Sequence, residues 1–177
     1  MQFDLRGVVF EDSIKFGQYR FHAWKNGIIG NHAEAKYLSF RNEMDANVFP
    51  CLGDAEGCHR LMRDISNRNG FLPEATWLAT YEDPDGGRVE NCGTIQGIRE
   101  SVDLGSIQNI GIVEHHRGKG IGSRIVRLSL KGFQQCGIRF VNLEVTVKNT
   151  GALRLYENLG FKIIKTVFKS AEIGNYD

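Results

Sequence analysis

The chain alternates between short apolar runs, typical of β-strands, and longer amphipathic runs, typical of α-helices. Strands are expected at residues 18–24, 75–81, 91–99, 107–113, 139–147 and 161–168. Helices are expected at residues 31–43, 54–67, 120–135 and 150–159. Asp54 stands where the N-cap of the second helix belongs, and the sequence Pro-Asp-Gly-Gly at 84–87 indicates a turn between two strands.

This order of elements predicts an α/β fold. The sequence contains no repeat, linker or low-complexity tract, so residues 1–177 are expected to form one domain. Little of the chain follows Phe168, and the tail 171–177 has room for only a short additional edge strand.

Composition narrows the classes of function. The chain has 177 residues, of which 41% are hydrophobic and 24% charged, which is enough for a substantial core. A net charge of +1 gives no electrostatic reason to expect binding to nucleic acid or to an acidic membrane. No apolar run has the length of a membrane span, and residues 1–10 lack the apolar core of a signal peptide, so a cytoplasmic protein is expected.

The cysteines Cys51, Cys58, Cys92 and Cys136 form no C-x-x-C pair and are expected to be reduced thiols, in agreement with a cytoplasmic location. Cys58 and His59 are neighbours, which suggests a nucleophile or a pair of metal ligands. Adjacent residues of a helix point about 100° apart, which favours a structural cysteine and no metal site.

The segment 117–122 reads Arg-Gly-Lys-Gly-Ile-Gly and joins the expected strand 107–113 to the expected helix 120–135. Its three glycines have no side chains that could cover the backbone N–H groups where the helix begins. The first amides of a helix lack intrahelical partners, and the helix dipole places about half a positive charge there, so such a segment attracts anions. Arg117 and Lys119 add positive charge, and the segment is therefore predicted to bind phosphate groups.

Two phosphate-binding motifs fit this segment poorly. A P-loop requires glycine where Val113 stands and serine or threonine where Gly120 stands. The dinucleotide fingerprint G-x-G-x-x-G is satisfied by Gly118 and Gly120 but has Ser123 in place of its third glycine. Glu144 lies near the spacing of a ribose-binding acid, so a nucleotide-binding oxidoreductase is a third hypothesis.

Two segments resemble the signatures of the GNAT N-acetyltransferases. Arg117, Gly120 and Gly122 match the first signature, which is Arg or Gln, two residues, Gly, one residue, then Gly or Ala. The second signature, N-x-x-A-x-x-L-Y-x-x-x-G-F, matches residues 149–161 throughout. Its marked residues are Asn149, Ala152, Leu155, Tyr156, Gly160 and Phe161. The resemblance covers about residues 75–170.

The resemblance implies a GNAT-like fold, with a mixed, mostly antiparallel central sheet of six to seven strands flanked by about four helices. It also implies that the sheet splays between the fourth and fifth strands of the family, here the segments 107–113 and 139–147. In the family, the pantetheine arm of acetyl-CoA lies in this gap and pairs with the exposed strand edge as an added strand would. Acetyl-CoA is therefore the expected co-substrate, and no metal is expected.

By the same resemblance, residues at the strand end, the glycine segment and the last helix contact the cofactor. They are Ile110, Gly111, Ile112, Arg117, Gly118, Lys119, Gly120, Ile121, Gly122 and Asn149. A glycine within a strand marks a bulge or a close backbone approach, although core packing is the alternative explanation for Gly111. Asn149 is alternatively the N-cap of its helix. His115 and His116 are expected to be solvent-exposed turn residues, with a catalytic role for either as the alternative.

Glu144 and Tyr156 are the predicted catalytic residues. A Leu-Glu-Val strand followed after twelve residues by the helix tyrosine resembles the ribosomal-protein N-terminal alanine acetyltransferases. In these the glutamate is the general base and the tyrosine the general acid, since a phenol with a pKa of about 10 can protonate or hydrogen-bond a departing thiolate. The alternatives are an outward-facing strand glutamate and a core tyrosine, with a water held by Gln108 as the base.

These observations predict transfer of acetyl from acetyl-CoA to a primary amine by direct attack, without an acyl-enzyme intermediate. The alternative is an acyl-CoA-binding sensor of the same fold that does not turn its ligand over. The acceptor, a small molecule or a peptide amine, is expected near the loop that holds Glu43, Asp45 and Phe49. The protein is expected to be a monomer or homodimer, with neither nucleic acid nor membrane as a partner.

Overall fold

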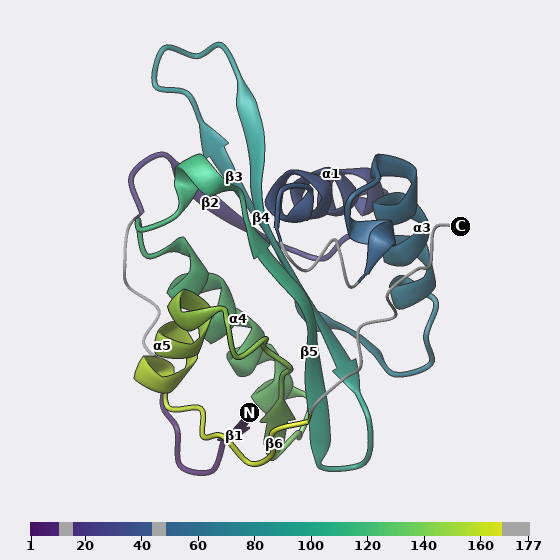
Figure 1. Cartoon of the computed structure of the whole chain (residues 1–177), viewed down its shortest axis with the longest axis vertical. Helices are drawn as coiled ribbons and strands as arrows, with labels where there is room; N and C mark the ends of the chain where they lie inside the picture. Colours follow the sequence, from purple (N-terminus) through teal and green to yellow (C-terminus); the bar gives the residue numbers. More distant parts are fainter. Residues whose placement is uncertain (11–15, 44–48, 168–177) are drawn as a thin grey trace, which may run out of the picture.

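The computed structural model describes residues 1–10, 16–43 and 49–167 (Figure 1). Its centre is a six-stranded sheet with the order β1-β6-β5-β4-β3-β2. The strands are β1 (Gln2–Asp4), β2 (Tyr19–Ala23), β3 (Phe71–Glu82), β4 (Val89–Arg99), β5 (Leu104–Ile112) and β6 (Phe140–Asn142). Neighbouring strands run antiparallel except β5 and β6, which run parallel. The predicted mixed, mostly antiparallel sheet is confirmed.

Helices cover both faces of this sheet. They are α1 (Ile29–Phe40), α3 (Ala55–Ser66), α4 (Ile121–Gln135) and α5 (Thr150–Leu159), with 3-10 turns η1 (Pro50–Leu52) and η2 (Glu114–His116). Figure 1 shows α1 and α3 on one side of the sheet and α4 and α5 on the other. None of the helices in the described ranges is long and apolar enough to cross a membrane.

The local signals that the sequence gives for α3 and α5 are confirmed. Asp54 is the N-cap of α3, and its carboxylate accepts a hydrogen bond from Gly57 N at 2.7 Å. α5 covers the expected residues and ends at Gly160, whose φ of 104° is a left-handed conformation that glycine adopts readily. These ends depend on residues close in sequence, which is why the pattern alone located them.

The strand expected at residues 139–147 is shorter than predicted. β6 pairs with β5 only until Asn142 meets Ser106. The next residue, Leu143, bonds to Met1 instead: Leu143 N donates to Met1 O at 3.0 Å, and Met1 N donates to Leu143 O at 2.7 Å. The chain is therefore held on the β1 side and separates from β5.

The strand expected at residues 161–168 is wrong for its described part. Residues 161–167 form one isolated bridge, between Lys162 and Gln2. β1, which the sequence analysis did not predict, pairs with β6 on the side away from β5. The side chains of Ile163 and Ile164 are consequently exposed. Residue 168 and the tail 171–177 lie outside the described residues.

α4 lies directly on the sheet because small residues make room for it. A Cβ on Gly132 would lie 1.9 Å from the Glu74 carbonyl oxygen, so only glycine allows this approach to β3. The buried ring of Phe133 fills the space above Gly97 and Gly105, where a Cβ would come within 2.9 and 2.5 Å of it. Truncating a buried phenylalanine to alanine costs about 3–5 kcal/mol, so this contact contributes strongly to the position of α4.

A buried polar cluster joins α1 to β4. His32, Lys36, Thr94 and Gln96 are each 0% exposed. Lys36 Nζ donates to Gln96 Oε1 at 2.6 Å, and Gln96 Nε2 donates to Thr94 Oγ1 at 2.6 Å. His32 Nδ1 lies 2.8 Å from the same hydroxyl. Burial lowers the pKa of Lys36 to about 7 and that of His32 to about 3, because the charged forms lose their hydration.

We predict that Lys36→Met makes the stability of the protein less dependent on pH. The pKa of Lys36 is about 7 in the folded chain against an ordinary value of 10.5, so the unfolded chain binds more protons between these values. The unfolding free energy of the wild type should therefore rise with pH across this window, and that of the variant should rise less.

Urea unfolding at several pH values between about 7 and 10 measures both slopes. Lys25→Met changes an exposed lysine in the same way and should leave the slope unchanged. Parallel slopes for wild type and Lys36→Met would show that Lys36 keeps its ordinary pKa in the folded protein.

Candidate functional site

The segment between β5 and α4 forms the turn that its glycines predict. Gly118 and Gly120 have left-handed backbones, with φ of 74° and 79°. Gly120 is the N-cap of α4 and provides no side-chain cap, and Arg124 N donates to Gly120 O at 3.0 Å to close the first turn. The first N–H groups of an α-helix have no intrahelical acceptor. Here they are the backbone N–H groups of residues 120–123, which are therefore suited to bind an anion.

Arg117 ties this segment to the rest of the protein. Its Nε donates to Ile112 O at 2.9 Å and its Nη2 donates to Ser39 O at 3.1 Å. Its Nη1 donates to Glu43 Oε1 at 2.6 Å in an ion pair. The guanidinium thus connects the end of α1 with the end of β5.

The remaining residues of the segment differ in what they expose. Lys119 is exposed, with its Nζ 6.0 Å from the centre of the Tyr19 ring. Ile121 is buried in the core, so only its backbone faces the start of α4. Both cations of the segment are exposed, but the guanidinium of Arg117 is already held by three hydrogen bonds.

β5 has an open edge beside this segment. On the β6 side its pairing ends at Ser106, and in the described parts of the chain no other strand pairs there. On the β4 side the register shifts between Thr94 and Gln96, and Asn109 has a left-handed φ of 45°. Such a shift marks a β-bulge. Residues 110–112, the predicted cofactor contacts, follow this bulge.

Gly111 is a glycine because α1 packs against it. A Cβ on Gly111 would lie 2.7 Å from Ser39 Cβ and 2.8 Å from the Phe40 ring. Side chains of α1 fill this space, which agrees with the packing explanation for Gly111, and its contact with the cofactor stays a prediction. The bulge itself is at Asn109, a position that the sequence analysis did not identify because asparagine is also common in loops.

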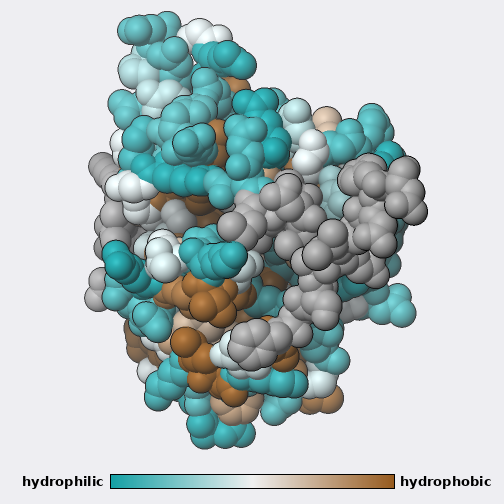
Figure 2. All heavy atoms as spheres, viewed as in Figure 1, coloured by the Kyte–Doolittle hydropathy of each residue, from teal (hydrophilic) through white to brown (hydrophobic). Residues whose placement is uncertain are grey.

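α5 meets the other two elements at Gly122. A Cβ on Gly122 would lie 3.3 Å from Leu155 Cδ2 and 3.8 Å from Ile112 Cγ1, so the start of α4, α5 and the end of β5 converge there. Asn149 caps α5, since its Oδ1 accepts from Ala152 N at 3.1 Å, which confirms the N-cap interpretation. On the face drawn in Figure 2, apolar side chains gather in the lower half, where Figure 1 draws α4, α5 and β6.

Tyr156 lies in the core of this region. Its side chain is 4% exposed and belongs to the main hydrophobic cluster. Its ring packs edge-on against Phe161, with ring centres 5.7 Å apart. The core position considered in the sequence analysis is therefore confirmed for the ring, and the role of the phenol stays a prediction.

Glu144 is not part of a strand, so the expectation of a carboxylate inside an apolar strand is wrong. It lies two residues beyond the end of β6 and is exposed, because the chain leaves β5 at Asn142. Burial lowers the pKa of the Met1 amine, and the negative charge of Glu144 opposes that shift. Its role as a base stays a prediction.

A second carboxylate is linked to β5. Gln108 Nε2 donates to Ser106 Oγ at 3.0 Å, and Ser106 Oγ donates to Glu100 Oε1 at 2.5 Å. Sequence analysis had singled out Gln108 but not Glu100, which stands outside the strand pattern in the β4–β5 turn. The chain of hydrogen bonds from Gln108 through Ser106 therefore ends at the Glu100 carboxylate, which can accept a proton.

Two of the four cysteines, Cys58 and Cys92, are buried in the core. Cys58 is buried, and its thiol donates weakly to Leu52 O at 3.6 Å. Burial raises the pKa of Cys58 to about 11 and that of Cys92 to about 12. Because the thiolate is the nucleophile and the metal ligand, these thiols are inert at neutral pH, as the sequence favoured for Cys58.

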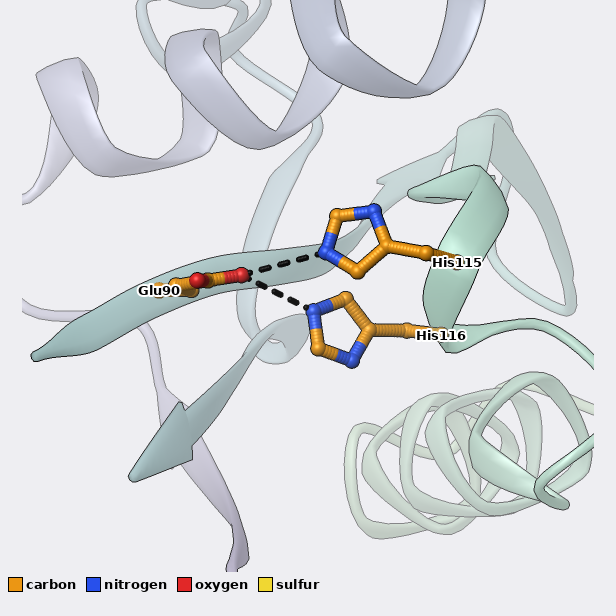
Figure 3. Close-up of side chains that lie close together, drawn as sticks. All are labelled: Glu90, His115 and His116. Carbon is orange, nitrogen blue, oxygen red and sulfur yellow. Dashed lines mark hydrogen bonds and ion pairs between the residues drawn. The ribbon is translucent and has the colours of Figure 1, made fainter. Parts of the chain in front are cut away.

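The expectation for the two histidines is correct for His115, which is exposed, and wrong for His116, which is 3% exposed. Both Nε2 atoms lie 3.1 Å from Glu90 Oε2 (Figure 3). Burial lowers the pKa of His116, and hydrogen bonds from His115 and His116 lower that of Glu90. Sequence reasoning missed Glu90 because it lies 25 residues before His115.

The expected acceptor loop is described only in part. Asp45 and the residues up to Val48 lie outside the described residues, Glu43 pairs with Arg117, and Phe49 is exposed. A pocket of about 220 Å³ lies between α1 and α3 and is lined by Gly30, Ala33, Glu34, Tyr37, Ala55, Glu56 and His59. A pocket of about 430 Å³ near β1 is lined by Gln2, Phe3, Asp4, Phe140, Leu159, Gly160, Lys162 and Ile164.

A comparison with known protein families identifies the family to which this arrangement of elements belongs. The sequence model of the Acetyltransferase (GNAT) family matches residues 49–161, more than half of the chain. The chain belongs to the GNAT acetyltransferase family. The matched residues include β5, α4 and α5, the three elements that converge at Gly122.

Curated GNAT relatives match parts of the chain. N-alpha-acetyltransferase MAK3 of Arabidopsis thaliana is 38% identical over 79 residues, which cover 43% of this chain and 42% of the relative. A mycothiol acetyltransferase of Corynebacterium glutamicum is 37% identical over 140 residues, which cover 76% of this chain and 43% of the relative. The matched segments span less than half the length of these relatives.

A solved structure shares the fold. The NatC complex bound to Gag peptide and CoA contains a chain that superposes with a TM-score of 0.63 at 22% identity, covering 84% of this chain and 87% of that chain. At this identity the likeness shows the fold alone.

Proposed function

We propose that this GNAT-family chain is an acetyl-CoA-dependent N-acetyltransferase that moves acetyl to a primary amine by direct attack. The observation that carries the proposal is the convergence at Gly122 of the open end of β5, the start of α4 and α5. These elements would hold the three parts of one extended ligand, and membership of the family supports the same activity.

Residues 118–122 would bind the pyrophosphate of acetyl-CoA through their backbone N–H groups and the charge of Lys119. The fit is good because a Cβ at Gly118 would meet no atom within 4 Å, which leaves the backbone accessible. Lys119 is exposed beside it. Arg117 would act mainly by holding the loop in place, since its guanidinium is already bonded to Ile112, Ser39 and Glu43.

The open edge of β5 would pair with the pantetheine arm as an additional strand. Ile110 and Gly111 would provide most of these contacts, because Ile112 O already accepts a hydrogen bond from Arg117. Asn149 uses its amide oxygen to cap α5, so its NH2 group is the part that would donate to the arm.

Glu144 and Tyr156 would move the protons of the reaction. When bound, acetyl-CoA supplies a thioester carbonyl for attack and a thiolate as the leaving group. Glu144 would take a proton from the incoming ammonium, directly or through water, which reaches this exposed residue. Tyr156 would hydrogen-bond or protonate the departing thiolate.

The proposed acceptor is a small molecule or a peptide that carries a primary amine. The names of the two relatives denote one acceptor class each, an N-terminal amine for MAK3 and a small molecule for the mycothiol enzyme. The pocket between α1 and α3 contains Glu34 and Glu56, whose negative charge would attract an ammonium group. A screen of both classes with thiol release as the readout would identify the acceptor and separate an enzyme from a sensor.

The first prediction for this site is that CoA raises the melting temperature, because a ligand that binds only the folded state stabilises it. Lys119→Glu should reduce the shift by placing a negative charge at the start of α4, and Gly120→Asp should remove it. Lys25→Glu makes the same charge change at another exposed lysine and should keep the shift. A wild type that shows no shift at saturating CoA would contradict the proposed function.

A second prediction concerns the general acid. Tyr156→Phe should lower kcat on the order of a hundredfold and leave CoA affinity nearly unchanged, since general acid–base groups contribute factors of this size. Pre-steady-state kinetics would establish that chemistry limits the rate. An unchanged kcat would reduce Tyr156 to its packing role against Phe161.

The third prediction concerns the general base. Glu144→Gln retains the shape of the side chain but accepts no proton, so kcat/KM should fall at neutral pH and recover in part at high pH, where the amine arrives deprotonated. Glu100→Gln is the matched comparison, because it removes the carboxylate that is hydrogen-bonded to Gln108 through Ser106. If the pH–rate profile changes in Glu100→Gln and not in Glu144→Gln, the base has been assigned to the wrong residue.

A further inference from the structure

Glu90, His115 and His116 form a compact group of ligand atoms outside the proposed acetyl-CoA site (Figure 3). Glu90 belongs to β4 and the two histidines to η2, and their ligand atoms all lie within 4.8 Å of one another. Val113 N donates to Cys92 O at 3.0 Å, which holds η2 beside β4. The backbone therefore brings the three side chains together.

We infer that Glu90, His115 and His116 bind a divalent transition-metal ion of the Zn²⁺ class. Two imidazoles and one carboxylate are a donor set that suits Zn²⁺ and do not suit Mg²⁺, which prefers oxygen ligands alone.

The distances fit such an ion. Zinc bonds of about 2.0–2.1 Å in a tetrahedral arrangement separate neighbouring ligand atoms by roughly 3.4 Å. Glu90 Oε2 lies 3.1 Å from each histidine Nε2, so small side-chain movements would make room for the ion.

His116 is oriented for this role by its surroundings. Its Nδ1 lies 2.9 Å from the hydroxyl of Tyr19, and its ring packs against the rings of Tyr19 and Tyr81. With the ion bound, Nε2 would carry no proton, and Nδ1–H would donate to the Tyr19 oxygen. A hydrogen bond at the second ring nitrogen is the usual support of a metal-binding histidine.

One side of the proposed metal site is buried in the protein, and the other side faces solvent. The His116 side chain is buried, whereas the His115 side chain is exposed. Water can therefore complete the coordination of the ion, as in sites with three protein ligands. The ion would join β4 to η2, the turn that leads directly into Arg117 and the glycine segment.

Cobalt(II) tests the inference, because it replaces Zn²⁺ and absorbs visible light in low-symmetry nitrogen and oxygen sites. The metal-stripped protein is titrated with Co²⁺, and Zn²⁺ binding is measured by calorimetry. We expect ligand-field bands at one equivalent, without sulfur-to-cobalt charge transfer, and displacement by Zn²⁺ but not by Mg²⁺. His115→Ala and Glu90→Gln should lose the bands, and His59→Ala, in the α1–α3 pocket, should keep them.

Tyr19→Phe provides a finer test. It keeps all three ligands but removes the hydroxyl at His116 Nδ1, and loss of such a partner weakens metal binding about 10-fold or more. The inference is overturned if the wild type binds no Co²⁺, or if His115→Ala and Glu90→Gln bind it as the wild type does. Neither readout uses acetyl-CoA, so the result is independent of the proposed transferase activity.

Discussion

The separation of β6 from β5 is the constraint on which the candidate site depends. Backbone N–H and C=O groups need partners, and an unpaired strand edge is a place where another extended chain can bind. Here β6 pairs with β5 only to Asn142, and Leu143 then bonds to Met1. β5 bulges at Asn109 and continues to pair with β4 at Gly111 and Ile112. An edge of β5 is left beside the start of α4, and α4 is kept there by the packing of Phe133 on the sheet.

Contacts at the end of β5 connect α1, on one side of the sheet, with the glycine segment that leads into α4 on the other side. Arg117 bonds to the last turn of α1 and to the end of β5, and Gly111 lets α1 come close to that strand. On the same helix, the buried Lys36 donates to Gln96 on β4 rather than to a carboxylate of the described residues. A buried lysine with a neutral partner costs stability where it is charged, so the stability that α1 contributes should rise with pH.

The sequence by itself determined the elements whose signals are local. Asp54 caps α3, Asn149 and Gly160 bound α5, and the glycines of 117–122 give the left-handed turn before α4. Each of these depends on residues within one or two turns of chain, so the pattern and the residue types suffice. Residues 117–122 and 149–161 also carry the family's two signatures, which is why the fold and the family could be predicted before the structure was known.

Only the tertiary structure decided which distant residues meet. β1 pairs with β6, residues 161–167 form only an isolated bridge to β1, and β6 ends before Glu144. Arg117 forms an ion pair with Glu43, which lies 74 residues earlier in the chain, and His116 of η2 is buried beside Glu90 of β4. These outcomes depend on which strand edges are already occupied and on which side chains the sheet brings together. Neither is encoded in local periodicity, because the free energy of such contacts arises only once the chain has closed around them.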